Sequence, residues 1–202
     1  MKKHYKRVLT IAGSDPSGGA GIQADLKTFS ACGCYGMSAI VAVVDENTVG
    51  VTGVHPVPVD FVTGQIRSVL DDIGADAVKI GMLHSSELIR AVRETLAAYD
   101  IRNIVLDPVM VATSGDRLLQ EEAIATLQEE LVPFVRVITP NIPEAEILLG
   151  RKIAGQERTL LRTQSFRVAQ SRTPARYRAY RRILQRRNRQ SDPSALHAAR
   201  HA

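Results

Sequence analysis

The stretch "LTIAGSDPSGGAGIQADLKTF", residues 9–29, places four glycines between an apolar run and a helical pattern. The overlapping run "RVLTIA" is short, apolar and β-branched, which predicts a strand. Ile22, Leu26 and Phe29 recur at i, i+4 and i+7, which predicts a helix over residues 21–33. Glycines between a strand and a helix let the backbone approach a ligand closely, so we expect a binding site in this loop.

Two common phosphate-binding loops do not fit this stretch. A P-loop requires Gly-x4-Gly followed by Lys and then Ser or Thr, because the lysine and the hydroxyl contact phosphate and magnesium. Gly13 and Gly18 have the spacing, but Gly19 and Ala20 stand where the lysine and the hydroxyl belong. The dinucleotide fingerprint matches "GAGIQA", but six residues separate its first glycine from the strand.

The composition is ordinary for a water-soluble globular protein, with 45% hydrophobic and 23% charged residues. No apolar run approaches the roughly 20 residues of a membrane-spanning helix. We interpret the start, "MKKHYKRVLTIAG", as a strand and not a signal peptide, because its short apolar stretch leads directly into the glycine loop. Cys32 and Cys34 suggest neither a disulfide framework nor a metal site, so we expect a reducing cytoplasm.

Strand-like and helix-like segments alternate up to about residue 150. Apolar runs predict further strands at residues 38–44, 75–82, 103–109 and 135–140. Helical spacing predicts helices at residues 59–74, 85–100, 118–132 and 143–150. Apolar strands separated by helices indicate an α/β fold with a mostly parallel sheet covered on both faces.

Helical periodicity also predicts buried faces, and topology predicts where ligands bind. The helix at residues 85–100 has Ser85 as its expected N-cap and a stripe of Leu88, Val92 and Leu96. The predicted face of the preceding helix consists of Phe61, Val62, Ile66, Val69, Leu70 and Ile73. Ligands bind at the carboxyl ends of parallel strands. The candidate segments are therefore residues 13–21, 45–47, 81–82, 107–110 and 141–144.

Five motifs occur in an order that matches one known family. They are "AGSDPSGGAGIQADLKTF", "ENTVGV", "KIGML", "VLDPVMVATSG" and "ITPNIPEAEILLG". Over residues 7–156 the sequence resembles the hydroxymethylpyrimidine/phosphomethylpyrimidine kinases of thiamine biosynthesis, in the ribokinase superfamily. The resemblance implies a Rossmann-like, three-layer ribokinase-type fold and commonly a cytoplasmic homodimer.

The resemblance implies a kinase that uses ATP and Mg²⁺. It phosphorylates 4-amino-5-hydroxymethyl-2-methylpyrimidine and then converts the monophosphate to the diphosphate. The positions that match the family's pyrimidine site are Gly13, Asp25, Val44, Glu46, Met82 and Val109. From residue type alone, Asp25 could instead be a solvated acid near the helix start, and Met82 and Val109 could be ordinary core residues.

A second matching group concerns metal and phosphate. Asp107 and Glu144 follow buried strands and would offer hard oxygen ligands to Mg²⁺. Asn141 matches a family position near the nucleotide phosphates. Asn141 and Glu144 are also suited to cap the helix around Pro143, and the two roles are compatible.

The family's catalytic segments have no counterpart in these residues. Family members continue with a "KGGH"-like lysine segment and a "GTGC" motif, whose backbone N–H groups form an anion hole and whose cysteine stands at the position of the catalytic base. Here the last glycine is Gly155, the last lysine is Lys152 and the last cysteine is Cys34. We therefore predict no catalytic residue in this sequence and little turnover, because each lost group costs about 10²-fold or more.

The composition changes abruptly near Glu157. Residues 1–157, predicted as the N-terminal part of the kinase domain, hold 14 Lys and Arg against 20 acids, whereas residues 158–202 hold 12 Arg and one acid. One hypothesis is that the natural reading frame is lost at residue 157 or 158. A genuine basic tail and a degenerate gene are the alternatives, and the coding DNA would decide between them.

Two other functions stay open. A pyridoxal-type vitamin kinase of the same superfamily is the first. The second is nucleic-acid binding through the arginine-rich tail, in which Tyr177 and Tyr180 would stack on bases. For the tail, an artefactual disordered segment is the favoured interpretation. The sequence thus predicts a pyrimidine-binding kinase fold, with no membrane partner and an unrelated tail.

Overall fold

The computed structural model describes residues 4–110, 119, 121–153 and 166–167. Its strands are β1 (Arg7–Ala12), β2 (Tyr35–Ile40), β3 (Ala42–Glu46), β4 (Val51–Pro56), β5 (Ala77–Ile80), β6 (Ile104–Leu106), β7 (Val137–Ile138) and β8 (Phe166–Arg167). The main sheet has six strands in the order β2-β1-β5-β6-β7-β8. All of its neighbours pair in parallel except β7 and β8, and β3 pairs with β4 in a separate antiparallel hairpin.

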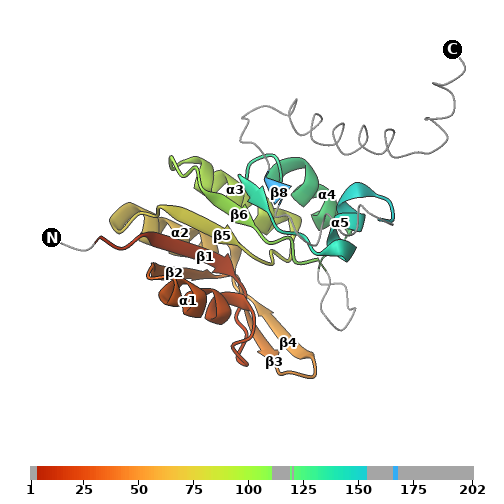
Figure 1. Cartoon of the computed structure of the whole chain (residues 1–202), viewed down its shortest axis with the longest axis horizontal. Coiled ribbons are helices and arrows are strands. Elements are labelled where there is room, and N and C mark those ends of the chain that lie inside the picture. Colours follow the sequence, from red (N-terminus) through yellow and green to blue (C-terminus); the bar gives the residue numbers. More distant parts are fainter. Residues whose placement is uncertain (1–3, 111–118, 120, 154–165, 168–202) are drawn as a thin grey trace, which may run out of the picture.

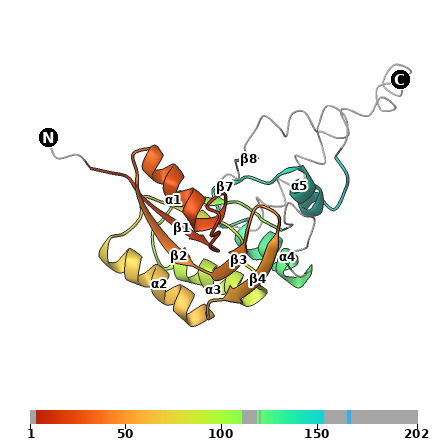
Figure 2. The same cartoon turned by 90° about the horizontal axis from the view of Figure 1, so that it is seen from below.

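Helices cover both faces of the main sheet. They are α1 (Gly21–Ala31), α2 (Val59–Asp72), α3 (Ser86–Ala97), α4 (Glu121–Thr126), its π-helical continuation η1 (Leu127–Leu131) and α5 (Ile142–Leu149). α1 lies on one face, and α2, α3 and α4 lie on the other (Figure 1, Figure 2). The predicted α/β fold with a mostly parallel sheet is therefore confirmed. Among the described residues, no helix is long and apolar enough to cross a membrane.

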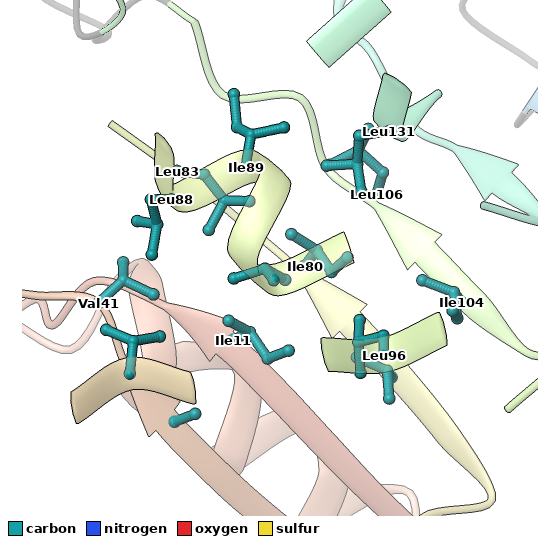
Figure 3. Close-up of a cluster of buried hydrophobic side chains, with 14 of the residues drawn as sticks. Ile11, Val41, Ile80, Leu83, Leu88, Ile89, Leu96, Ile104, Leu106 and Leu131 are labelled. Carbon is teal, nitrogen blue, oxygen red and sulfur yellow. The ribbon is translucent and has the colours of Figure 1, made fainter. Parts of the chain in front are cut away.

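The core lies between the sheet and the layer of α2 and α3. Ile11 of β1 and Ile80 of β5 are fully buried, and Leu88 and Leu96 of α3 belong to the same cluster (Figure 3). Ser85 caps α3 as predicted, because its hydroxyl accepts a hydrogen bond from the N–H of Leu88 at 3.2 Å. The periodicity of this helix therefore identified both its start and its buried face.

Residues 38–44, which we expected as one strand, divide between two sheets. β2 ends at Ile40, and β3 begins at Ala42 and pairs with β4, a strand that the patterns did not predict. The side chain of Gln65 accepts from the N–H of Ile40 at 2.9 Å and donates to its carbonyl at 3.0 Å. Because this amide satisfies the backbone at the break, the hairpin can leave the main sheet and extend away from it (Figure 1).

The predicted face of α2 is correct except for Phe61. Val62, Ile66 and Leu70 are buried, whereas the side chain of Phe61 is 66% exposed. Successive helical residues are about 100° apart. Phe61 comes one position before the buried Val62, so its side chain points away from the buried face. Its apolar residue type alone led to the wrong assignment.

The predicted boundary between residues 157 and 158, and the arginine-rich tail after it, lie almost wholly outside the described residues. The described exception is β8, in which Arg167 pairs with Val137 and Phe166 pairs with Ile138. β8 is thus a strand of two residues that pairs with β7 at the edge of the main sheet.

Candidate functional site

The carboxyl ends of four neighbouring strands lie along one edge of the main sheet. In spatial order these strands are β1, β5, β6 and β7. Gly13 follows β1, Met82 follows β5, Asp107 and the half-buried Val109 follow β6, and Asn141 follows β7. Segments that are far apart in the chain therefore meet at the edge where parallel sheets bind ligands.

The glycine loop after β1 is closed by the carboxylate of Asp15, which is only 3% exposed. This carboxylate accepts hydrogen bonds from the backbone N–H groups of Ser17 at 2.7 Å, Gly19 at 2.9 Å and Ala20 at 2.7 Å. The hydroxyl of Ser17, together with these N–H groups, holds the pKa of Asp15 below its ordinary value despite burial. An internal carboxylate thus uses the donors before α1 that a phosphate would need, so the loop is not a phosphate cradle.

Gly21 allows this loop to fold back onto the end of β1. Its φ is +55°, and a Cβ at this position would collide with the carbonyl oxygen of Gly13. The same oxygen accepts a hydrogen bond from the N–H of Ile22 at 2.9 Å. The close approach and the positive φ both require glycine.

Three of the predicted pyrimidine residues meet at one point, which we call the slot: Gly13, Val44 and Met82. A Cβ at Gly13 would lie 3.7 Å from both Met82 Cε and Val44 Cγ2. Ser14 ties β3 to this point, because its N–H donates to the carbonyl of Ala42 and its hydroxyl accepts from the N–H of Val44, both at 2.9 Å. Apolar walls beside bare backbone suit a flat ring.

Glu46 lies at the end of β3, next to the glycine loop. Burial, and then the negative charge of Asp15, raise the pKa of Glu46. Glu46 therefore offers a carboxyl group beside the glycine loop, where it could bond the polar edge of a ring.

Asp25 reaches the sheet and does not lie in solvent. Its Oδ2 accepts hydrogen bonds from Thr10 Oγ1 at 2.6 Å and from Lys79 Nζ at 2.9 Å. Its side chain is 16% exposed, and it lies beyond the first turn of α1. The alternative interpretation, a solvated acid that complements the helix dipole, is therefore wrong.

Lys79 is a site residue that the sequence patterns did not predict. It lies in β5, and its Nζ is 2.9 Å from Asp25 Oδ2 and 3.9 Å from Asp107 Oδ2. Lysine is seldom buried without a partner. The charged residue inside the apolar run "AVKI" was the signal that could have revealed it.

Asp107 and Glu144 form a pair of carboxyl groups beyond Lys79. Burial raises the pKa of Asp107, and the charge of Lys79 opposes this rise. Burial also raises the pKa of Glu144, and the charge of Asp107 contributes to the rise. The negative charge of Asp107 therefore acts on Glu144 across the ends of β6 and β7.

The donors fit Mg²⁺, which typically takes one or two carboxylates and completes its shell with phosphate oxygens and water. Within the described ranges, no group of three or more His, Cys, Asp or Glu side chains is placed to hold a metal ion. Asp107 and Glu144 would hold the ion, and the ion would neutralise developing charge on a phosphate.

Asn141 and Glu144 also cap α5, as the sequence suggested. Glu144 N–H donates to Asn141 Oδ1 at 2.9 Å, and Asn141 N–H donates to Glu144 Oε2 at 2.8 Å. This capping box fixes the position of the Glu144 carboxyl at the start of α5. The capping role therefore positions the group that the second role would use.

The slot lies at the ends of β1 and β5, and the carboxyl pair lies at the ends of β6 and β7, two strands further along the same edge. Lys79 and Asp25 lie between them. A mostly parallel sheet between helices, with polar side chains gathered at the carboxyl ends of its strands, is the architecture of the ribokinase-type α/β kinases. The chain belongs to the phosphomethylpyrimidine kinase family, whose model matches residues 15–171.

Curated relatives agree with this family. The hydroxymethylpyrimidine/phosphomethylpyrimidine kinase of Escherichia coli (strain K12) is 55% identical over 153 residues, which are 76% of this chain and 58% of that protein. The enzyme of the same name from Bacillus subtilis (strain 168) is 50% identical over 148 residues, 73% of this chain and 55% of that protein. The chain thus spans little more than half the length of these relatives.

Solved structures show the same fold. The crystal structure of phosphomethylpyrimidine kinase from Clostridium difficile 630 is 50% identical, with a TM-score of 0.72 over 76% of this chain and 67% of that chain. The pyridoxal kinase of Staphylococcus aureus in complex with pyridoxal is 38% identical, with a TM-score of 0.69 over 79% of this chain and 59% of that chain. Both kinases support a ribokinase-type architecture.

Proposed function

We propose that this chain binds 4-amino-5-hydroxymethyl-2-methylpyrimidine in the slot and derives from a kinase that phosphorylates it and then its monophosphate. The observation that carries the proposal is that a Cβ at Gly13 would lie 3.7 Å from both Val44 and Met82. Met82 follows β5, the strand that carries Lys79, which pairs with Asp25. Gly13 supplies open backbone, Val44 and Glu46 face the polar edge of the ring, and Met82 supplies one apolar wall. Val109, at the end of β6, would close the far wall.

We further propose that ATP and Mg²⁺ take part when the whole family domain is present. The Staphylococcus aureus pyridoxal kinase has been solved with AMP-PCP and with ADP. Asp107 and Glu144 supply the oxygen ligands for Mg²⁺, and Asn141 lies where the family meets the phosphates. We also propose that the chain is cytoplasmic and that the whole family domain assembles as a homodimer.

Calorimetric titration of the 202-residue chain with the pyrimidine tests the slot. We expect binding, and we expect Gly13→Val to abolish it because the added side chain fills the slot. Gly50→Val is the matched control, since a Cβ at Gly50 meets nothing within 4 Å. Equal binding by both variants would place the ring elsewhere, and no binding by the unchanged chain would overturn the proposal.

Pyridoxal is the second candidate substrate, because the structure of a relative holds it in the same fold. The two rings carry different polar groups along the edge that Glu46 would contact, so Glu46 would distinguish them by hydrogen bonding. A competition titration with pyridoxal decides: we expect the pyrimidine to displace it, and the reverse order of affinity would assign the chain to a pyridoxal-type kinase.

For residues 158–202 we keep the proposal of an unrelated basic segment, with nucleic-acid binding as the competing function. RNA binding by the whole chain and by residues 1–157, measured over a range of salt concentrations, tests it. A tail that binds RNA should lose affinity steeply as salt rises. We expect no difference between the two chains.

A further inference from the structure

Lys79 is placed unusually for a lysine in a parallel sheet. Its neighbours in β5, Val78 and Ile80, are buried, and its own side chain is 20% exposed. A Cβ at Gly81 would lie 3.2 Å from Lys79 Nζ and 2.9 Å from Ala12 Cβ. Ala12 and Gly81 directly precede the slot residues Gly13 and Met82, so the ammonium group lies next to the strand ends that carry the slot.

Lys79 and Thr10 hold the same oxygen of Asp25. Both hydrogen bonds, of 2.9 Å from Lys79 Nζ and 2.6 Å from Thr10 Oγ1, end on Oδ2. Thr10 and Lys79 are register partners on β1 and β5, so the two donors come from adjacent points of one rigid sheet. Two donors on one oxygen fix the rotation of the carboxylate and leave Oδ1 as the oxygen that can accept from a ligand.

The charges of the cluster also depend on Lys79. Asp25 and Asp107 are both acidic, and Lys79 is the cation that contacts both, at 2.9 Å and 3.9 Å. Without it, two carboxylates would face each other in a partly buried site, where repulsion is weakly screened. This repulsion would turn Asp25 away from its position, which would weaken a hydrogen bond to it.

We infer that Lys79 is a positioning residue, which with Thr10 orients Asp25 so that its free oxygen accepts the hydroxyl of the bound pyrimidine. This role rests on the proposed function, because it concerns the same ligand. Lys79 touches Asp25 and not the ring, so it governs recognition of the hydroxyl and not of the ring. A hydroxyl that donates to a carboxylate makes a charge-assisted bond, and its loss costs about tenfold or more in affinity.

The test compares two ligands on the 202-residue chain by calorimetry. One is 4-amino-5-hydroxymethyl-2-methylpyrimidine, and the other is 4-amino-2,5-dimethylpyrimidine, which lacks only the hydroxyl. We expect the unchanged chain to prefer the first by about tenfold or more. We expect Lys79→Met to reduce this preference to about threefold or less while its affinity for the second ligand stays the same, and Thr10→Val to reduce the preference partly.

Lys6→Met is the matched control, since Lys6 also pairs with an aspartate, Asp76, but lies before the amino end of β1. It should keep the full preference. If Lys79→Met fails to fold, Lys79→Gln, which removes the charge but keeps a donor, takes its place. An unchanged preference in the Lys79 variant, or an equal loss of both ligands, overturns the positioning role alone. No binding of either ligand by the unchanged chain overturns the proposed function and this role together.

Discussion

At the scale of single residues, the buried charges explain most of this site. Asp15 closes the glycine loop, and Lys79 joins Asp25 to Asp107. The motif match predicted Asp25 and Asp107 but not their partners, because a motif names ligand contacts and says nothing about which residues neutralise them. Lys79 and Asp15 are identified as important only when one asks which group pairs with each buried charge or buried donor.

Replacing Asp15 tests the loop. Asp15→Ala leaves the N–H groups of Ser17, Gly19 and Ala20 without their acceptor. We expect the free energy of unfolding to fall by about 3 kcal/mol, since hydrogen bonds to charged groups contribute about 1.5–3 kcal/mol each and are not additive. Urea unfolding measures this, and Asp72→Ala, an exposed acid on α2, should change it by less than about 0.5 kcal/mol. Equal effects would mean that Asp15 is not the closing group.

The same residue predicts a dependence of stability on pH. The pKa of Asp15 is lowered in the folded state, chiefly by the Ser17 hydroxyl. Its stabilising contribution is therefore complete above the unfolded value of about 3.9 and is lost as the pH falls through the lower, folded pKa. Unfolding of the unchanged chain and of Asp15→Asn between pH 7 and pH 2 should show a gap that narrows only below about pH 4. A constant gap would rule out the ionised form as its source.

Replacing two glycines by alanine should change the stability of the chain in opposite directions. Gly21→Ala places a Cβ against the Gly13 carbonyl at a φ of +55°, whereas a Cβ at Gly64, inside α2, meets nothing within 4 Å. We expect Gly21→Ala to destabilise the chain by more than about 1 kcal/mol and Gly64→Ala to stabilise it by about 0.5–1 kcal/mol. Thermal melts of both variants decide, and a stabilising Gly21→Ala would refute the loop geometry.

At the scale of elements, the sequence predicted correctly those segments whose apolar pattern belongs to a single helix or a single sheet. The stripe of Leu88, Val92 and Leu96 predicted α3 and its buried face, because one side of that helix faces the core throughout. Residues 38–44 were predicted wrongly as one strand because they belong to two sheets. The two hydrogen bonds at the break join the backbone of Ile40 to the side chain of Gln65, which is 25 residues away in the sequence. Local periodicity cannot report such a long-range contact.

The capping box of α5 gives the prediction at this scale. Asn141→Ala removes the acceptor for Glu144 N–H, which is held at 2.9 Å. We expect a loss of about 1 kcal/mol in the free energy of unfolding, measured in urea, and recovery in Asn141→Ser, whose hydroxyl can take the same role. If the serine variant were no more stable than the alanine variant, the cap would not be what stabilises this helix start.

At the scale of the whole molecule, the topology brings the site together, and this part was predictable. Parallel strands joined by helices place their carboxyl ends on one edge, so motifs after β1, β5, β6 and β7 had to meet. The hairpin of β3 and β4 was not predictable in the same way, because Val43, Val49, Val51 and Val54 are exposed and imitate a buried pattern.

The last prediction separates binding from catalysis. The proposed site comprises the slot at Gly13 and the carboxyl groups of Asp107 and Glu144, but none of these 202 residues forms a "GTGC" motif, and the last glycine is Gly155. A lost general base costs about 10²- to 10⁴-fold and a lost anion-hole donor about 10²- to 10³-fold. We therefore expect these 202 residues to bind the pyrimidine but to transfer phosphate from ATP at least about 10⁴-fold more slowly than the 55% identical Escherichia coli kinase assayed beside them. Binding without turnover would show that the first half of the domain recognises substrate independently of the second. Turnover near that of the relative would show that residues outside the missing motif can supply the base and the anion hole.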